Sequence, residues 1–346
     1  MTIELNNIGM IKEAIVKIDG LTVIAGENDT GKSTLGKTLF SLIKADNITR
    51  KGDKAIKKQI LATRLNLVFD GNVTLDGTIS LLDDNKNKIA YAHIKNKNFV
   101  TDFESGNNEK NRLFFDATII QSPIVFDMAD FFNSVARMRD RKKFDYGLDF
   151  DINYPYTLWD LFDKISKKNP FPEAKIQQIL SKNIQSIISG EFKQESGKFF
   201  FYKSLTNTTP LKIEMANTAV GIKSFGLLQL LNDNRFFHER YCLILDEPEV
   251  HLHPKWQLKM AEIIVELVKN GVKVLVNSHS PYMIEALKRY SEVEKIEDKT
   301  NFYLAEEGYI KKLNDSNSET LVKIFEKLSE PFDVFEEMES ERFQNG

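Results

Sequence analysis

One short segment bounded by glycines, near the start of the chain, restricts its fold and chemistry more than any other feature. It runs from Gly26 to Ser33, follows the apolar β-prone stretch 21–25, and leads into residues 35–43, which have helical spacing. In this strand–loop–helix setting, the N–H groups of the loop and the start of the helix can bind a phosphate group. The spacing G-x4-G-K-S therefore predicts a loop that binds a nucleoside triphosphate.

Two side chains of this loop have expected roles. Lys32 would reach the β- and γ-phosphates, and Ser33 would ligate Mg²⁺. The residues expected to contact the nucleotide are Gly26, Glu27, Asn28, Asp29, Thr30, Gly31, Lys32, Ser33 and Thr34. A nucleoside triphosphate and Mg²⁺ are therefore the expected ligands.

Composition indicates a chain with a sizeable core and no overall bias toward nucleic acid. Hydrophobic residues make up 42% of the 346 residues, and the net charge is −3, although basic residues can still gather locally. The single cysteine, Cys242, excludes an intramolecular disulfide and is expected in a buried strand. The opening residues lack the basic start of a signal peptide, and no apolar run is long enough to span a bilayer. We expect a soluble, cytoplasmic protein.

Strand and helix patterns divide the chain into four parts. Residues 1–125 hold the P-loop and an antiparallel β-meander, 126–197 a helical insert, 198–315 the second half of the core, and 316–346 a C-terminal helix and acidic tail. Strands over 198–203, 211–215, 241–245 and 272–276 alternate with helices, two of which begin at Pro254 and Pro281. This alternation predicts an α/β core with a mixed, largely parallel sheet. The meander and the helical insert would interrupt this core.

A second motif, far downstream, ends a buried strand in two adjacent carboxylates. Residues 241–245 are apolar and lead into Asp246 and Glu247. Asp246 would orient Mg²⁺ through its water shell, whereas Glu247 would polarise the attacking water as general base. The next strand ends near His279, which would hydrogen bond to the γ-phosphate and sense its charge. These residue types in this order predict hydrolysis of the bound triphosphate.

Taken together, the motifs resemble those of ABC-type ATPases of the OLD-like and SMC-like branch, the stand-alone AAA family ATPases often found in bacterial defence systems. The resemblance covers nearly the whole chain. It implies an ABC-type P-loop ATPase core with an antiparallel β subdomain and a helical insert, and ATP as the nucleotide. It also implies that Walker B is 243–247, that His279 is the switch histidine, and that Gln121 is the Q-loop glutamine that senses Mg²⁺ and water. An ordinary surface glutamine at a strand end is the alternative for Gln121.

The segment 219–227 resembles the signature of this family, with Ser224 and Gly226 in its Ser-x-Gly positions. The signature of one subunit completes the γ-phosphate site of another in this family, so the resemblance implies a homodimer or a higher assembly. Phe225 interrupts the glycine pair of the transporter signature, which favours the non-transporter branch. We expect Ser224 and Gly226 at the start of a helix over 227–231.

The function implied by the resemblance is an ATP-hydrolysing dimeric switch, without a membrane partner, that controls a separate effector such as an HNH or Toprim nuclease. A Toprim domain within the chain is not expected, because 67 residues follow His279 (346 − 279). A RecF/SMC-like DNA-repair ATPase and a slow-turnover scaffold that sequesters a toxic partner are the alternatives. DNA or RNA contact would use the basic runs 50–64 and 137–143, for which solvated faces are the simpler interpretation.

Two smaller groups have a structural interpretation. His251 and His253 lie near acidic residues, but further ligands at a fitting spacing are missing, so a zinc site is not expected. The resemblance instead places both in the D-loop after Walker B. Asp149 and Asp151 are expected to be loop residues and not a nuclease pair.

Overall fold

The computed structural model describes residues 1–48, 54–69, 75–95, 99–105, 114–146, 155–170, 175–206 and 208–344. Most of its strands form one large sheet: β1 (Thr2–Ile8), β2 (Ile11–Lys17), β3 (Leu21–Ala25), β4 (Leu75–Leu82), β5 (Lys88–Lys95), β6 (Phe99–Ser105), β7 (Asp116–Ile120), β11 (Tyr241–Asp246), β12 (Lys273–Ser278), β13 (Thr300–Glu306) and β14 (Tyr309–Lys311). A smaller sheet contains β8 (Gly190–Glu195), β9 (Lys198–Lys203) and β10 (Leu211–Glu214).

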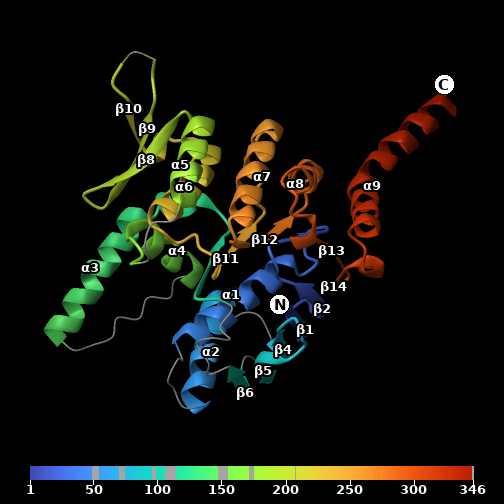
Figure 1. The fold of residues 1–346 in the computed structure, drawn as a ribbon, viewed down its shortest axis with the longest axis horizontal. Helices are drawn as coiled ribbons and strands as arrows, with labels where there is room; N and C mark the ends of the chain where they lie inside the picture. The colour runs from blue at the N-terminus through green and yellow to red at the C-terminus, as the bar shows by residue number, and fades with distance from the viewer. Residues whose placement is uncertain are drawn as a thin grey trace.

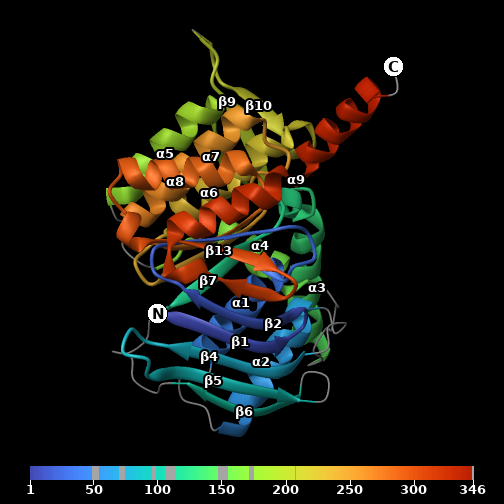
Figure 2. The same ribbon diagram turned by 90° about the vertical axis from the view of Figure 1, so that its right-hand side faces the viewer.

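The α-helices are α1 (Lys32–Ile48), α2 (Lys54–Phe69), α3 (Ala129–Tyr146), α4 (Tyr156–Ser166), α5 (Lys175–Ile188), α6 (Val220–Asp233), α7 (Pro254–Lys269), α8 (Pro281–Val293) and α9 (Asn317–Gln344). Helices α7 and α8 lie on one side of the large sheet, and α1 and α2 lie on the other (Figures 1 and 2). The far end of α9 extends away from the rest of the molecule in both views. Within the described residues, no helix is both long and apolar enough to cross a bilayer.

The large sheet has eleven strands in the order β6-β5-β4-β1-β2-β14-β13-β3-β12-β11-β7. The neighbours β13, β3, β12, β11 and β7 pair in parallel, whereas β1, β2, β4, β5 and β6 pair with one another in antiparallel fashion. The α/β class and the mixed sheet predicted from the sequence are therefore confirmed. The predicted meander is continuous with the large sheet, because β4 pairs with β1.

The parallel strands are buried on both faces, which explains their unbroken apolar sequences. Alternate residues enter different cores: Val23 and Leu245 pack in the core that includes α7, whereas Ile24 and Ile244 pack in the core that includes α1. Side chains of a strand point alternately to its two faces, so each strand is held from both sides. The carboxyl ends of β3, β11 and β12, where the predicted site residues lie, therefore belong to the most buried part of the sheet.

The strands predicted at 198–203 and 211–215 do not join the large sheet. They form β9 and β10, which pair with β8 in the separate three-stranded sheet. Phe199 and Phe201 are buried on one face of β9, and their rings pack against Phe126 and Phe192. Each of these strands pairs with its neighbour along the chain, so neither pairs with a strand of the large sheet. The predicted domain limits at 126, 198 and 316 remain predictions, although β8 and β9 pair across residue 198.

Four buried or partly buried charges join the helical insert to the core. Lys44 Nζ of α1 lies 2.5 Å from Asp116 Oδ1 and 2.5 Å from Asp160 Oδ1. Lys164 Nζ of α4 lies 2.8 Å from Asp116 Oδ2 and 3.1 Å from Asp160 Oδ2. Burial would raise the pKa of the Asp116 carboxyl, but Lys164 and Lys44 outweigh it and lower this pKa to about 2. The ion-pair energy of Asp116 is therefore retained above about pH 4 and lost as the pH falls through about 2.

Removing one member of this cluster should destabilise the protein strongly. We expect Lys164→Met to lower the free energy of unfolding at neutral pH by about 3–5 kcal/mol, because it leaves two carboxylates with one lysine. Lys167→Met, at the residue that follows this helix, is the matched control: its pair with Asp163 is exposed, so its loss should cost less than about 1 kcal/mol. Urea denaturation of both variants checks this. Equal losses in the two variants would contradict the role given to the cluster.

Candidate functional site

The turn between β3 and α1 has the backbone that the glycine spacing predicts. Gly26 has a φ of +155°, and a Cβ there would lie 2.2 Å from the carbonyl oxygen of Ala305. Gly31 has a φ of +95°, and a Cβ there would lie 2.8 Å from Cγ1 of Ile11. A residue with a side chain would be strained at both positions. Between these glycines, the exposed residues Glu27, Asn28 and Asp29 form the outer part of the loop, and α1 begins at Lys32.

The predicted lysine points into its own loop. The Lys32 side chain is buried, and its Nζ donates hydrogen bonds to the carbonyl oxygens of Gly26, at 2.9 Å, and Glu27, at 2.5 Å. Burial lowers the pKa of Lys32 from its ordinary value, and the nearby Glu247 and Asp246 oppose this shift. The structure thus gives the loop a positive charge held by neutral carbonyl groups.

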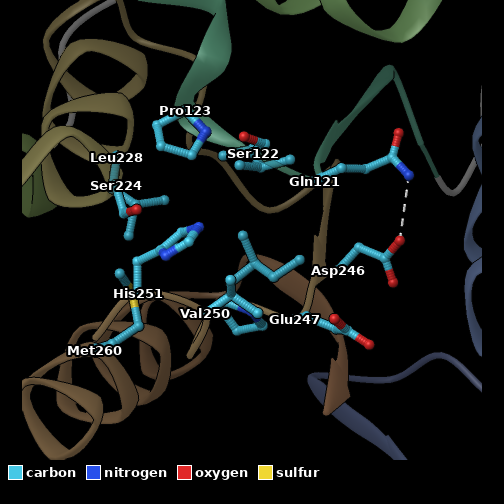
Figure 3. A pocket seen from close by; sticks show the side chains of 13 residues that line it. Gln121, Ser122, Pro123, Ser224, Leu228, Asp246, Glu247, Val250, His251 and Met260 are labelled. Carbon is cyan, nitrogen blue, oxygen red and sulfur yellow. Dashed lines mark hydrogen bonds between the residues drawn. The ribbon is translucent and has the colours of Figure 1, made fainter. Parts of the chain in front are cut away.

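Asp246 joins the loop to two other strand ends. Its Oδ1 accepts hydrogen bonds from Ser33 Oγ, at 2.9 Å, and from Asn277 Nδ2, at 2.8 Å. Its Oδ2 accepts one from Gln121 Nε2, at 3.3 Å (Figure 3). The three residues predicted to surround Mg²⁺, Ser33, Asp246 and Gln121, are therefore together. Sequence reasoning missed Asn277, although the register of β11 and β12 pairs it directly with Asp246.

The donor set fits a magnesium ion. A hydroxyl, a carboxylate and a side-chain amide offer the oxygen ligands that Mg²⁺ prefers, and this ion usually takes only one or two carboxylates in addition to phosphate oxygens and water. Within the described part of the chain, His, Cys, Asp and Glu form no group of three or more able to hold a metal by themselves. The arrangement is therefore suited to an ion shared with a phosphate group.

Glu247 and His279 lie beside this centre. His279 Nδ1 is 3.3 Å from Glu247 Oε1, and both side chains are partly exposed. The backbone N–H of Glu247 donates to the carbonyl of Asn277 at 2.9 Å. Glu247 has a φ of +55°, which is uncommon for a residue other than glycine and is typical of positions where the surrounding structure sets the backbone. The predicted base and the predicted switch histidine are neighbours in space.

The signature segment differs from expectation in its local structure. Helix α6 begins at Val220 and not near residue 227, and Ser224 Oγ donates to the carbonyl of Val220 at 3.3 Å. Ser224 is therefore one turn inside the helix. Gly226 serves packing, because a Cβ there would lie 2.6 Å from the ring of Phe192. The sequence prediction was wrong here because no proline or side-chain cap marks the start of α6, and Gly221 is accommodated in its first turn.

Ser224 nevertheless borders a cavity of about 170 Å³ together with other predicted site residues. Gln121, Glu247 and His251 also line it, and most of the remaining wall is apolar (Figure 3). The N-cap residue of α6, Ala219, makes no side-chain hydrogen bond to the first turn. Helix α6 therefore begins without a side-chain cap near this cavity.

The other candidate residues have mixed outcomes. His253 is the N-cap of α7, and its side chain accepts a hydrogen bond from the backbone N–H of Lys255. Asp149 and Asp151 lie outside the described residues. The first basic run begins outside them and continues on α2, and most side chains of the second run are not described. Their possible contact with DNA or RNA remains a prediction.

Parts of this chain are similar in sequence to known proteins. A family model described as "AAA ATPase domain" matches residues 139–284, which include Asp246, Glu247 and His279. The chain is similar to Septu protein PtuA of Bacillus thuringiensis, at 22% identity over 286 residues that cover 78% of this chain and 68% of PtuA. The match to an ATPase domain agrees with the predicted ATPase class, whereas the assignment to the OLD-like branch remains a prediction.

Solved structures of similar fold include an SMC head bound to the C-winged helix domain of ScpA, with a TM-score of 0.47, 12% identity, and coverage of 90% of this chain and 95% of that chain. They also include the ADP conformation of an ATP-binding cassette from an ABC transporter, with a TM-score of 0.39, 12% identity, and coverage of 94% and 98%. Nothing about function follows from likeness of this degree.

The hydrogen bonds to Asp246 lead to a prediction. Asp246→Asn would put an NH₂ group in place of one acceptor oxygen, so at least one of its three donors would lose its acceptor. We expect the free energy of unfolding to fall by about 1–3 kcal/mol. Gln121→Ala removes only the longest of these contacts and should cost less than about 1 kcal/mol. Thermal or urea unfolding without nucleotide measures both, and an undiminished stability of Asp246→Asn would contradict the interpretation.

Proposed function

We propose that this chain binds ATP with Mg²⁺ and hydrolyses it to ADP and phosphate, as a homodimer whose nucleotide state controls a separate effector in bacterial or phage defence. The observation that carries the proposal is the meeting of Ser33, Asp246, Glu247 and His279 beside a glycine-bounded loop with a buried lysine. A base next to a loop suited to phosphate is what hydrolysis of a phosphoanhydride requires.

Each side chain has a defined part in this proposal. Lys32 exchanges its two carbonyl contacts for the β- and γ-phosphate oxygens of ATP. Ser33 and Asp246, with Gln121, hold Mg²⁺, which neutralises charge on these phosphates. Glu247 accepts the proton of the attacking water, and His279 donates a hydrogen bond toward the γ-phosphate.

The dimer and the effector have separate support. Ser224 lines the cavity beside Glu247, and the uncapped first turn of α6, residues 220–222, has N–H groups without an intrahelical acceptor that could meet an anion. The similarity to PtuA and the motif resemblance support a defence context. An HNH or Toprim nuclease is the effector class that we propose. Steady-state turnover with and without the product of the neighbouring gene tests this coupling.

Two substitutions separate binding from hydrolysis. Lys32→Ala deletes the charge inside the loop and should weaken ATP binding about 10- to 100-fold. Glu247→Gln keeps the shape of the base but cannot accept the proton, so ATP binding should persist while kcat falls at least about 100-fold. Equilibrium binding of a fluorescent ATP analogue and phosphate release measure the two effects. Normal turnover in Lys32→Ala would refute the P-loop role, and normal turnover in Glu247→Gln would show that another residue is the base.

A mixing experiment tests whether two chains share one site. Ser224→Arg should spare ATP binding at Lys32 but block closure of the dimer through its bulk and charge. In a mixed dimer of Ser224→Arg and Lys32→Ala chains, both changes fall in one shared site and the other site stays intact, so ATPase activity should partly return. A mixture that stays inactive while subunit exchange is demonstrated would contradict independent shared sites.

A further inference from the structure

The loop after β11 contains a third carboxylate, Glu249, which lies deeper than the two expected to act in catalysis. Its side chain is only 4% exposed. Its Oε1 accepts hydrogen bonds from Ser278 Oγ at 2.7 Å, from the backbone N–H of His279 at 3.0 Å and from the backbone N–H of Ser280 at 3.2 Å. One oxygen of Glu249 thus holds three consecutive residues at the end of β12.

This contact determines where His279 can be. The His279 side chain is 42% exposed, so packing alone does not fix its ring. Its Nδ1 lies 3.3 Å from Glu247 Oε1 and 3.8 Å from Glu249 Oε1. Glu249 accepts hydrogen bonds from the backbone N–H groups of His279 and Ser280 and from the side-chain hydroxyl of Ser278. The position of the ring relative to Glu247 therefore depends on Glu249.

Stability alone gives little reason for a carboxylate here. Glu249 Oε2 is buried and, within the described residues, has no hydrogen-bond partner. A buried charge with an unpaired oxygen carries a desolvation cost, and apolar replacements for buried charged groups are often neutral or stabilising. A charged acceptor does, however, bind several N–H and O–H donors more strongly than a neutral one.

We propose that Glu249 is a positioning residue that fixes the 278–280 segment so that His279 stays beside Glu247. The proposal rests on the proposed ATPase function for its kinetic consequence, but the tether itself is independent of activity. Gln257 offers a matched comparison, because it is also buried and bonds to the same segment, accepting from Ser280 Oγ at 2.6 Å without contacting the His279 backbone.

The tether is tested by hydrogen exchange of the His279 and Ser280 amides in the nucleotide-free chain. Glu249→Ala should speed exchange of the His279 amide at least about tenfold, because this amide loses its acceptor, and exchange of the Ser280 amide by less, because it keeps Ser278 Oγ as an acceptor. Gln257→Ala should leave the His279 amide within about threefold of wild type, since its two lost hydrogen bonds, to Ser280 Oγ and the Leu252 carbonyl, do not involve this amide. Circular dichroism and thermal melting establish that both variants are folded. Unchanged exchange in folded Glu249→Ala, or equal acceleration in both variants, would overturn the proposal.

The kinetic consequence is tested by a double-mutant cycle. Glu249→Ala should lower kcat about 100-fold with KM for ATP within about threefold, because a misplaced His279 affects turnover and the P-loop is untouched. In a His279→Ala background, Glu249→Ala should lower kcat further by less than about threefold, since Glu249 acts through His279. Glu249→Gln, which keeps an acceptor oxygen, should recover most of the lost kcat. If the two substitutions lower kcat by independent factors that multiply in the double variant, the positioning role would be overturned.

These two readouts separate failure of this proposal from failure of the ATPase assignment. A wild-type chain that releases no phosphate from ATP would refute the assignment, and amide exchange would still decide whether Glu249 holds the segment. An active wild-type chain with unchanged exchange in Glu249→Ala would refute the tether and leave the ATPase assignment intact.

Discussion

A single buried carboxylate, that of Asp246, organises the candidate site. It lies at the end of β11 and accepts hydrogen bonds from Ser33 after β3, Asn277 at the end of β12, and Gln121 after β7. A carboxylate removed from water is costly unless donors surround it, so the three donors and the acid stabilise one another. Residues that are up to 244 positions apart (277 − 33) meet because parallel strands end at the same edge of the sheet.

Around this carboxylate the backbone is restricted rather than flexible. Gly26 and Gly31 have positive φ values that no larger residue would adopt without a clash, and Glu247 and His251 have positive φ values despite their side chains. The strands that lead into these positions are buried from both sides by separate cores. Rigid strands therefore hold the strained loop residues in place, which keeps the side chains of the site at fixed distances.

The sequence predicted those parts of the site that depend on local pattern. The strand Leu21–Ala25, the glycine spacing, and the starts of α7 at Pro254 and α8 at Pro281 all appear in the structure at the expected residues. Proline at the first turn and a preceding capping side chain define a helix start without reference to the rest of the chain. The same local reasoning failed for α6, where no such signal marks Val220.

Features that depend on tertiary contacts were missed. Strands β13 and β14 were not predicted, because their sequence resembles other short apolar runs. Strand β13 pairs with β3, and its Ala305 carbonyl explains why residue 26 must be glycine. Asn277 and Glu249 gave no signal, because a polar residue near a strand end has many possible partners. The register Asp246↔Asn277, once known, identifies Asn277 at once. The chemistry of the site residues could be predicted from the sequence, whereas the pairing of strands that are distant along the chain could not.

The charged side chains around Lys32 carry a net negative formal charge. Asp246, Glu247 and Glu249 provide three carboxylates within the electrostatic reach of Lys32, the lysine of the loop. By formal charge, Lys32 and these three carboxylates sum to −2 (+1 − 3), so a polyphosphate alone would meet net repulsion at short range. On the proposed function, a divalent cation bound with the nucleotide beside Ser33 and Asp246 would cancel this charge (−2 + 2 = 0). Nucleotide and Mg²⁺ would therefore bind to this site with positive coupling, each favouring the other.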